Sequence, residues 1–173
     1  MFLNKTKLFL VISICLIFFF LTYNDVKSQE IKIIKGKALV VDGDTIKING
    51  EKIRFSGIDA PESYYKGKEQ ICFKGEDEIS CGKLSKEFLI QEIKNLKVTC
   101  EIEAKPDRYK RKLGECFVND KSLSRILVKN GYAFDYAKFS KKKYSKEQEY
   151  AKENNLGLWG MKFEYPWIFR RKN

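Results

Sequence analysis

Several acidic and basic side chains that could carry out hydrolytic chemistry lie close together in the chain. Asp44, Arg54, Asp59 and Glu62 fall within nineteen residues. Asp44 begins one predicted strand and Asp59 ends a later one, and such strand ends can converge in a β-meander. Two carboxylates, a backbone carbonyl and water suit Ca²⁺, which takes about six to eight oxygen ligands. Glu62 could point into the same pocket as a general base. Taken singly, each carboxylate also has a plainer role, either closing a turn or lying on the surface.

Two arginines could supply the positive charge that such chemistry needs. A phosphodiester under attack gathers negative charge on its oxygens, and the planar guanidinium group matches these oxygens in bidentate geometry. Preorganised charge at a developing oxyanion is usually the largest single contribution to catalysis. Arg54 and Arg111 are therefore candidates for holding a phosphate, although any one arginine is unremarkable in so basic a chain.

The chain contains no histidine. This excludes Ser-His-Asp and Cys-His catalysis, the histidine-based nucleases and phosphodiesterases, and the HExxH metalloproteases. Any hydrolysis must rely on carboxylates, basic side chains, tyrosine or a hard metal ion.

The net charge favours an anionic partner. The chain has 34 basic and 23 acidic residues, and the part beyond residue 28 keeps 31 and 22, a net charge of +9. Nucleic acid, an anionic lipid surface and an acidic polymer all fit this balance, as does a role in solubility alone. A run of lysines between residues 138 and 146, interleaved with aromatic rings, could follow a nucleic-acid backbone or form a solvated face.

The first 28 residues differ from the rest of the chain. Lys5 and Lys7 precede an apolar run of 16 residues, 8–23, which is short beside the roughly 20 that a membrane span needs. The segment resembles a secretory signal that ends at Val26-Lys27-Ser28, and an uncleaved membrane anchor through residues 8–23 is the alternative. We therefore expect residues 29–173 to form one exported domain that is monomeric and either secreted, periplasmic or membrane-anchored.

Four cysteines remain beyond residue 28, and an even number in an exported chain indicates disulfides. Three pairings are possible. Cys72 and Cys81 flank a short loop, whereas Cys100 and Cys116 are symmetrical about residue 108 in a predicted antiparallel hairpin. These positions favour the pairs 72–81 and 100–116. A zinc site is the competing interpretation, but the spacing is not CxxC and no histidine could assist.

Hydrophobic periodicity predicts the elements that must position these residues. Alternating and β-branched runs predict five strands, at residues 33–41, 45–48, 52–58, 96–104 and 112–118. Helices are predicted at residues 83–95, 123–130 and 144–156, and the polar residues 63–80 are predicted to form a loop. This order suits a mainly β (α+β) domain, a five-stranded Greek-key barrel of the OB type with three α-helices, whose face commonly binds oligonucleotides.

Four motifs, taken in order, resemble the staphylococcal nuclease (thermonuclease) family. They are Val41-Asp42-Gly43-Asp44-Thr45, Ile53-Arg54-Phe55, Gly57-Ile58-Asp59-Ala60-Pro61-Glu62 and Asp107-Arg108-Tyr109-Lys110-Arg111. The segments 157–159 and 163–167 are similar to the ending of bacterial members. The resemblance covers nearly all of the chain beyond the first 28 residues.

The resemblance implies an OB-fold barrel and Ca²⁺-dependent cleavage of DNA and RNA. Asp44 and Asp59 would bind Ca²⁺ through their carboxylates, Ala60 would bind it through its backbone carbonyl, and Glu62 would assist the attacking water. The residues that would hold the phosphate are Arg54 and Arg111. Those that would contact the nucleotide are Arg108, Tyr109 and, in a looser correspondence, Tyr136.

The chain departs from the family pattern in three places. Ala60 replaces a threonine of some members, which should be harmless because the carbonyl is the ligand. Lys110 stands where the family usually has glycine; if its φ is positive, it costs about 1–2 kcal/mol and could displace Arg111. The loop 63–81 is longer than in the simplest members and lies beside Glu62.

Two other functions fit parts of the pattern. One is a non-catalytic OB-fold module that binds nucleic acid without cutting it, and the other is an envelope-associated protein that uses its basic surface on anionic lipids. Neither needs two aspartates, a glutamate and two arginines in this order, so the sequence favours cleavage.

Overall fold

A computed structural model of the protein describes residues 31–173. The predicted signal or anchor, including its apolar run 8–23, lies outside the described residues. Within residues 31–173, none of the helices combines the length and apolar character needed to cross a membrane.

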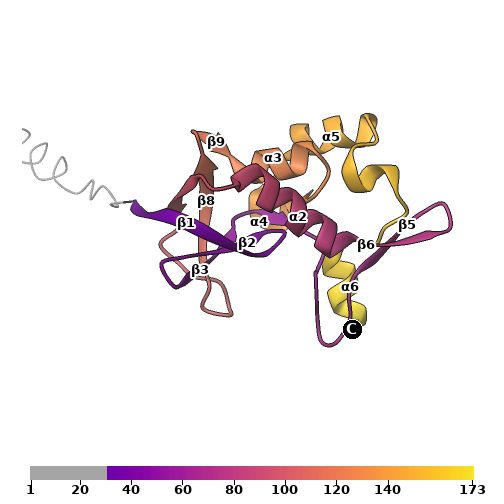
Figure 1. The fold of residues 1–173 in the computed structure, drawn as a ribbon, viewed down its shortest axis with the longest axis horizontal. Helices are drawn as coiled ribbons and strands as arrows, with labels where there is room; N and C mark the ends of the chain where they lie inside the picture. Colours follow the sequence, from indigo (N-terminus) through magenta and orange to yellow (C-terminus); the bar gives the residue numbers. More distant parts are fainter. Residues whose placement is uncertain (1–30) are drawn as a thin grey trace, which may run out of the picture. The chain divides into compact units, whose positions relative to one another are not determined.

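Five strands close into a barrel (Figure 1). In spatial order they are β3 (Glu51–Phe55), β2 (Thr45–Ile48), β1 (Lys32–Asp42), β7 (Lys97–Ile102) and β8 (Lys112–Val118). Neighbours in this order are antiparallel, and a parallel pairing of β3 with β8 closes the sheet on itself. The short β9 (Lys121–Ser122) extends the sheet beyond β8. The predicted OB-type barrel is confirmed.

Alternating apolar residues explain why these segments form a barrel. In β2, Ile46 and Ile48 are fully buried and Lys47 between them is exposed, which is the period of two expected of a strand with one face on a core. The β2–β3 turn places Asn49 and Gly50 at φ values of 50° and 87°, as a tight two-residue hairpin requires.

The α-helices include the three that periodicity predicts and two shorter ones that it does not. The predicted helices are α2 (Cys81–Ile93), α3 (Leu123–Lys129) and α5 (Ser145–Glu153). The additional elements are α4 (Ala137–Ser140), the 3-10 turn η1 (Gly157–Gly160) and α6 (Pro166–Lys172). Figure 1 shows α3 beside α5 and, elsewhere, α6 near the carboxyl end of the chain.

The polar segment 63–80, predicted as a loop, contains a short hairpin in its second half. Its strands are β5 (Ile71–Lys74) and β6 (Asp77–Ser80). The prediction of a loop was wrong there, because Gly75 and the charged residues around it hide the sequence pattern of two short strands. The ends of these strands are joined covalently. The tie is the disulfide Cys72–Cys81, and the second predicted disulfide, Cys100–Cys116, joins directly opposed residues of β7 and β8. Both favoured pairings are therefore present.

A second, smaller core lies beside the barrel and consists largely of aromatic side chains. Its buried members are Cys72, Cys81, Phe134 and Leu158, and the rings packed against them include Trp159, Phe163, Tyr165 and Trp167. Both tryptophans therefore pack the C-terminal segment. This core fixes α6 and the Cys72–Cys81 hairpin to the rest of the domain.

Candidate active site

Asp44 lies in the turn between β1 and β2, where the pairing shifts register between Val40 and Asp42. Such an irregularity bends the strand and redirects its side chains. The Asp44 carboxylate is buried, and its Oδ2 accepts a hydrogen bond of 3.0 Å from the backbone N–H of Ala60. Its Oδ1 accepts one of 2.9 Å from the hydroxyl of Thr45. The turn therefore holds the carboxylate in one orientation.

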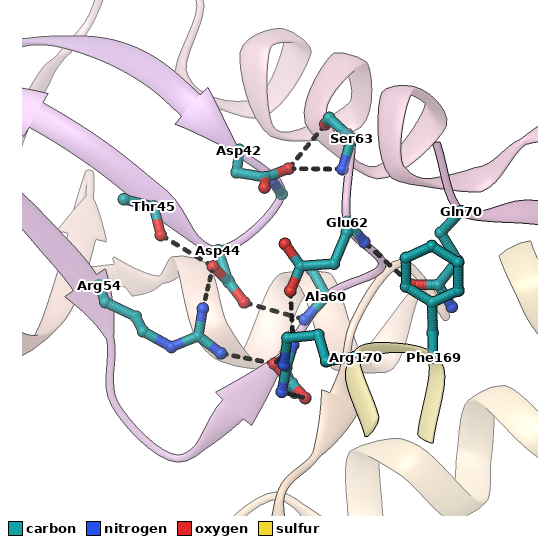
Figure 2. A network of polar contacts seen from close by, with 12 residues as sticks. Asp42, Asp44, Thr45, Arg54, Ala60, Glu62, Ser63, Gln70, Phe169 and Arg170 are labelled. Carbon is teal, nitrogen blue, oxygen red and sulfur yellow. Dashed lines mark hydrogen bonds and ion pairs between the residues drawn. The ribbon is translucent and has the colours of Figure 1, made fainter. Parts of the chain in front are cut away.

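Arg54 bridges the two aspartates predicted to bind a metal. Arg54 in β3 is paired with Thr45 in β2, so the Arg54 side chain starts next to Asp44. One guanidinium nitrogen lies 2.5 Å from Asp44 Oδ1 and the other lies 2.5 Å from Asp59 Oδ1. Burial alone would lower the pKa of Arg54, but the two carboxylates outweigh it and raise that pKa, so the arginine stays charged. Two carboxylates thus converge on one cation, as Figure 2 shows for the Asp44 side.

Asp59 is placed by a two-residue pairing away from the main sheet. It belongs to β4 (Ile58–Asp59), which pairs with β10 (Phe134–Asp135) so that Asp59 is opposite Phe134. The residue is completely buried. A buried carboxylate is costly unless it is paired, and Asp59 is paired with Arg54 and also with Arg170.

Glu62 is held in position by its backbone. Its N–H donates a 3.0 Å hydrogen bond to the side-chain oxygen of Gln70, whose amide nitrogen in turn donates to the carbonyl oxygen of Glu164 at 2.7 Å. The first turn of α2 packs against the same backbone, because a Cβ at Gly82 would lie only 2.1 Å from the Glu62 oxygen. Burial raises the pKa of Glu62, against a lowering contribution from the hydrogen bond with Arg170. A raised pKa suits a group that must accept a proton.

Arg170 was missed by the sequence analysis. It comes from α6 and forms an ion pair of 2.7 Å with Asp59. A second ion pair joins it to Glu62 at 2.5 Å (Figure 2). The residue stands 108 positions after Glu62, in a run of basic residues that marks only a helix end. No local pattern in the sequence distinguishes it from Arg171, so only the packing of α6 reveals it.

The remaining predicted phosphate ligand, Arg111, belongs to a separate turn between β7 and β8. Within residues 31–173 its only ion pair is with Asp107, at 2.7 Å. Lys110 has a φ of 62°, the positive value that glycine would adopt more easily. Tyr109 is 61% exposed and lies under the guanidinium groups of Arg108 and Arg111. The structure therefore does not join this turn to the carboxylates, and it leaves an open aromatic and basic surface there.

Tyr136, the loosest of the predicted nucleotide contacts, stacks on Trp167 with ring centroids 5.0 Å apart and planes 6° from parallel. Phe139 packs edge-on against the Tyr136 ring, with ring centroids 4.8 Å apart. Tyr136 thus already takes part in the aromatic packing that anchors α6.

The donor set around Asp44 and Asp59 suits a hard cation. Among residues 31–173 there is no group of three or more acidic, histidine or cysteine side chains that could hold a metal ion. A cation would therefore need the two aspartates together with the Ala60 carbonyl and water, which is the all-oxygen set that the resemblance implies. The two carboxylates fit this role because their oxygens lie close enough together to contact a single group, the guanidinium of Arg54.

Comparison with known sequences identifies the domain. The profile of the family described as "Staphylococcal nuclease homologue" matches residues 52–161. The chain is 38% identical over 130 residues to "Succinoglycan biosynthesis protein ExoI" of Rhizobium meliloti (strain 1021), over 73% of this chain and 64% of that protein. It is 33% identical over 123 residues to "Staphylococcal-like nuclease CAN1" of Arabidopsis thaliana, over 69% and 33%. To "Endonuclease YhcR" of Bacillus subtilis (strain 168) it is 32% identical over 151 residues, over 77% and 12%.

The chain spans less than two thirds of the length of each of these relatives. The profile match nevertheless covers more than half of the chain and includes Arg54, Asp59 and Glu62, while Asp44 and Arg170 lie on either side of it. Together with the closed barrel and the converging carboxylates, the match shows that the chain belongs to the staphylococcal nuclease family.

Proposed function

We propose that the protein is a Ca²⁺-dependent nuclease that hydrolyses phosphodiester bonds of DNA and RNA. The observation that carries this proposal is the convergence of Asp44 and Asp59 on one cationic group, with Glu62 joined to the same cluster through Arg170. Two of the relatives carry names that describe nucleases. The fold alone would also suit a binding protein, so the proposal rests on these side chains.

In this proposal the chain's own residues divide the chemistry between them. Asp44, Asp59 and the Ala60 carbonyl would hold Ca²⁺, which when bound would polarise a phosphate oxygen and acidify a water. Glu62 accepts the proton of the attacking water, and its raised pKa favours that transfer. Arg54 donates hydrogen bonds to the phosphate oxygens as negative charge develops on them.

Arg111 would join Arg54 on the phosphate only after it leaves Asp107. The Asp107–Arg111 pair lies within one turn that carries Lys110 at positive φ, so a small rearrangement of that turn would redirect the guanidinium group. Substrate phosphate, which offers a bidentate partner, would favour the exchange.

The substrate should be recognised mainly through its backbone. Phosphate contacts carry no sequence information, so we expect little sequence preference and a strong dependence on salt concentration. Arg108 and Tyr109 form an exposed pair in which the guanidinium carbon lies 4.7 Å from the ring centroid, and this surface could stack on a base.

We also propose that the protein is exported and acts as a monomer, secreted or periplasmic, with residues 1–28 as its signal or as a membrane anchor. Two disulfides support this location because they persist in oxidising compartments.

Hydrolysis of single-stranded DNA by oxidised protein 29–173, with millimolar Ca²⁺ and again with a chelator, tests the proposal. Cleavage that requires Ca²⁺ is the expected result. A folded sample that binds DNA but does not cut it would overturn the catalytic proposal and favour the non-catalytic binding module.

A further inference from the structure

The cluster of carboxylates contains a second cation that the family pattern does not provide. Asp59 Oδ1 accepts hydrogen bonds from Arg54 at 2.5 Å and from Arg170 at 3.1 Å, and Asp59 Oδ2 accepts another from Arg170 at 2.7 Å. Arg170 also donates to Glu62 Oε1 at 2.5 Å. A single guanidinium group therefore occupies both oxygens of a proposed metal ligand and one oxygen of the proposed base.

Helix α6 fixes the backbone from which the Arg170 side chain extends. Pro166 is buried in the first turn, and Trp167 stacks on Tyr136 at 5.0 Å and on Tyr165 at 4.5 Å. These contacts fix the backbone that carries Arg170. The packing of the aromatic side chains therefore determines where the Arg170 side chain starts.

A divalent cation would need the same oxygen atoms that Arg170 uses. Each carboxylate oxygen has two lone pairs, and Asp59 Oδ1 already accepts two hydrogen bonds. A metal ion beside Asp59 would also lie close to a charged guanidinium group, and like charges repel strongly where water is largely excluded. Metal and guanidinium therefore cannot both keep their full set of contacts with Asp59.

We propose that Arg170 is an active-site residue that competes with the divalent cation for Asp59 and Glu62. This inference rests on the proposed function. In the metal-free protein Arg170 neutralises the cluster, and cation binding requires the guanidinium group to leave Asp59 while α6 stays packed. Withdrawal of Arg170 also frees Glu62 to accept a proton.

Calorimetric titration of the purified protein with Ca²⁺ alone tests this competition without measuring activity. We expect Arg170→Gln to bind Ca²⁺ at least about tenfold more tightly than the wild type, because the competitor is gone. Arg171→Gln is the matched control, since it removes the same charge from the next position of the same helix, and it should change the affinity less than about twofold. Equal or weaker binding by Arg170→Gln, compared with Arg171→Gln, would overturn the proposal.

Asp44→Asn separates the two proposals. If it weakens Ca²⁺ binding while Arg170→Gln fails to tighten it, the metal site stands and only the competition is wrong. If Asp44→Asn leaves binding unchanged, both the proposed metal site and the competition are wrong.

A measurement on the wild-type protein covers the case in which Arg170→Gln does not fold. The Nη protons of a guanidinium group held by two carboxylates exchange slowly and give resolved ¹⁵N-correlated NMR signals. We expect the Arg170 signals to be present in chelator and lost on saturation with Ca²⁺. Signals that survive saturation would contradict the competition.

Discussion

Replacing Arg54 by methionine should destabilise the domain far more than the loss of an ordinary ion pair. The Arg54 side chain is 15% exposed, and its partners Asp44 and Asp59 are 5% and 0% exposed, with both contacts at 2.5 Å. Removing one partner of a buried ion pair costs about 3–5 kcal/mol, because a charge is left without compensation. Arg170 still forms an ion pair with Asp59 in the variant, so Asp44 is the carboxylate left without a counter-cation. Methionine keeps much of the volume, so the loss is mainly electrostatic.

The free energy of unfolding can be measured by urea titration at neutral pH in chelator, with fluorescence of the two tryptophans as the signal. Millimolar Ca²⁺ should recover part of the lost stability, because an ion bound only by the folded state stabilises it.

Arg125→Met is the matched control. Arg125 pairs with Glu147, but its side chain is 46% exposed, and exposed pairs contribute about 0–1 kcal/mol. A loss below about 1 kcal/mol for Arg54→Met, equal to that of the control, would refute the view that Arg54 compensates two buried charges.

Other changes test the remaining parts of the site. Glu62→Gln should lower kcat by about 10²–10⁴-fold with the fold intact, and near-normal activity of this variant would rule out Glu62 as the base. Because burial raises the pKa of Glu62 above 4.5, kcat/KM of the wild type should fall as the pH drops through that raised value. Gly82→Ala should place a Cβ 2.1 Å from the Glu62 backbone oxygen, which lowers both the melting temperature and kcat by moving Glu62; unchanged values for both would contradict the close packing. Lys110→Gly should raise the free energy of unfolding by about 1 kcal/mol, because the φ of 62° strains a residue with a Cβ. Lys110→Ala, which keeps the Cβ, should gain little in the same urea titration.

The barrel could be predicted from sequence because its signals are local. Alternation in β2, the Asn49-Gly50 turn and the separation of Cys100 from Cys116 each specify a short-range geometry, and these geometries agree with one another. The convergence of Asp44 and Arg54 follows from the same hairpins, since Thr45 pairs with Arg54. Asp59 is placed instead by the pairing of β4 with β10. Their roles in catalysis remain predictions.

The parts that could not be predicted depend on contacts between distant segments. Gln70 holds Glu62 through its side chain, although a glutamine in a polar loop gives no sign of this. The position of Arg170 depends on the stacking of Trp167 on Tyr136, which no hydrophobic periodicity in the sequence predicts. Arg111 shows the opposite case, because its motif suggests a phosphate ligand but its nearest carboxylate, Asp107, lies in its own turn.

The long separation between Arg170 and Glu62 has a consequence for how the domain folds. Asp44, Asp59 and Glu62 come from one short segment together with a single compensating arginine, whereas Arg170 is 108 residues from Glu62. Local hairpins form early and contacts of long sequence separation form late. We therefore expect the three carboxylates to approach one another before α6 docks, so that their mutual repulsion slows assembly. Salt or a divalent cation in the refolding buffer would relieve that repulsion, so the docking of α6 completes the charge balance of the native state as a late folding step.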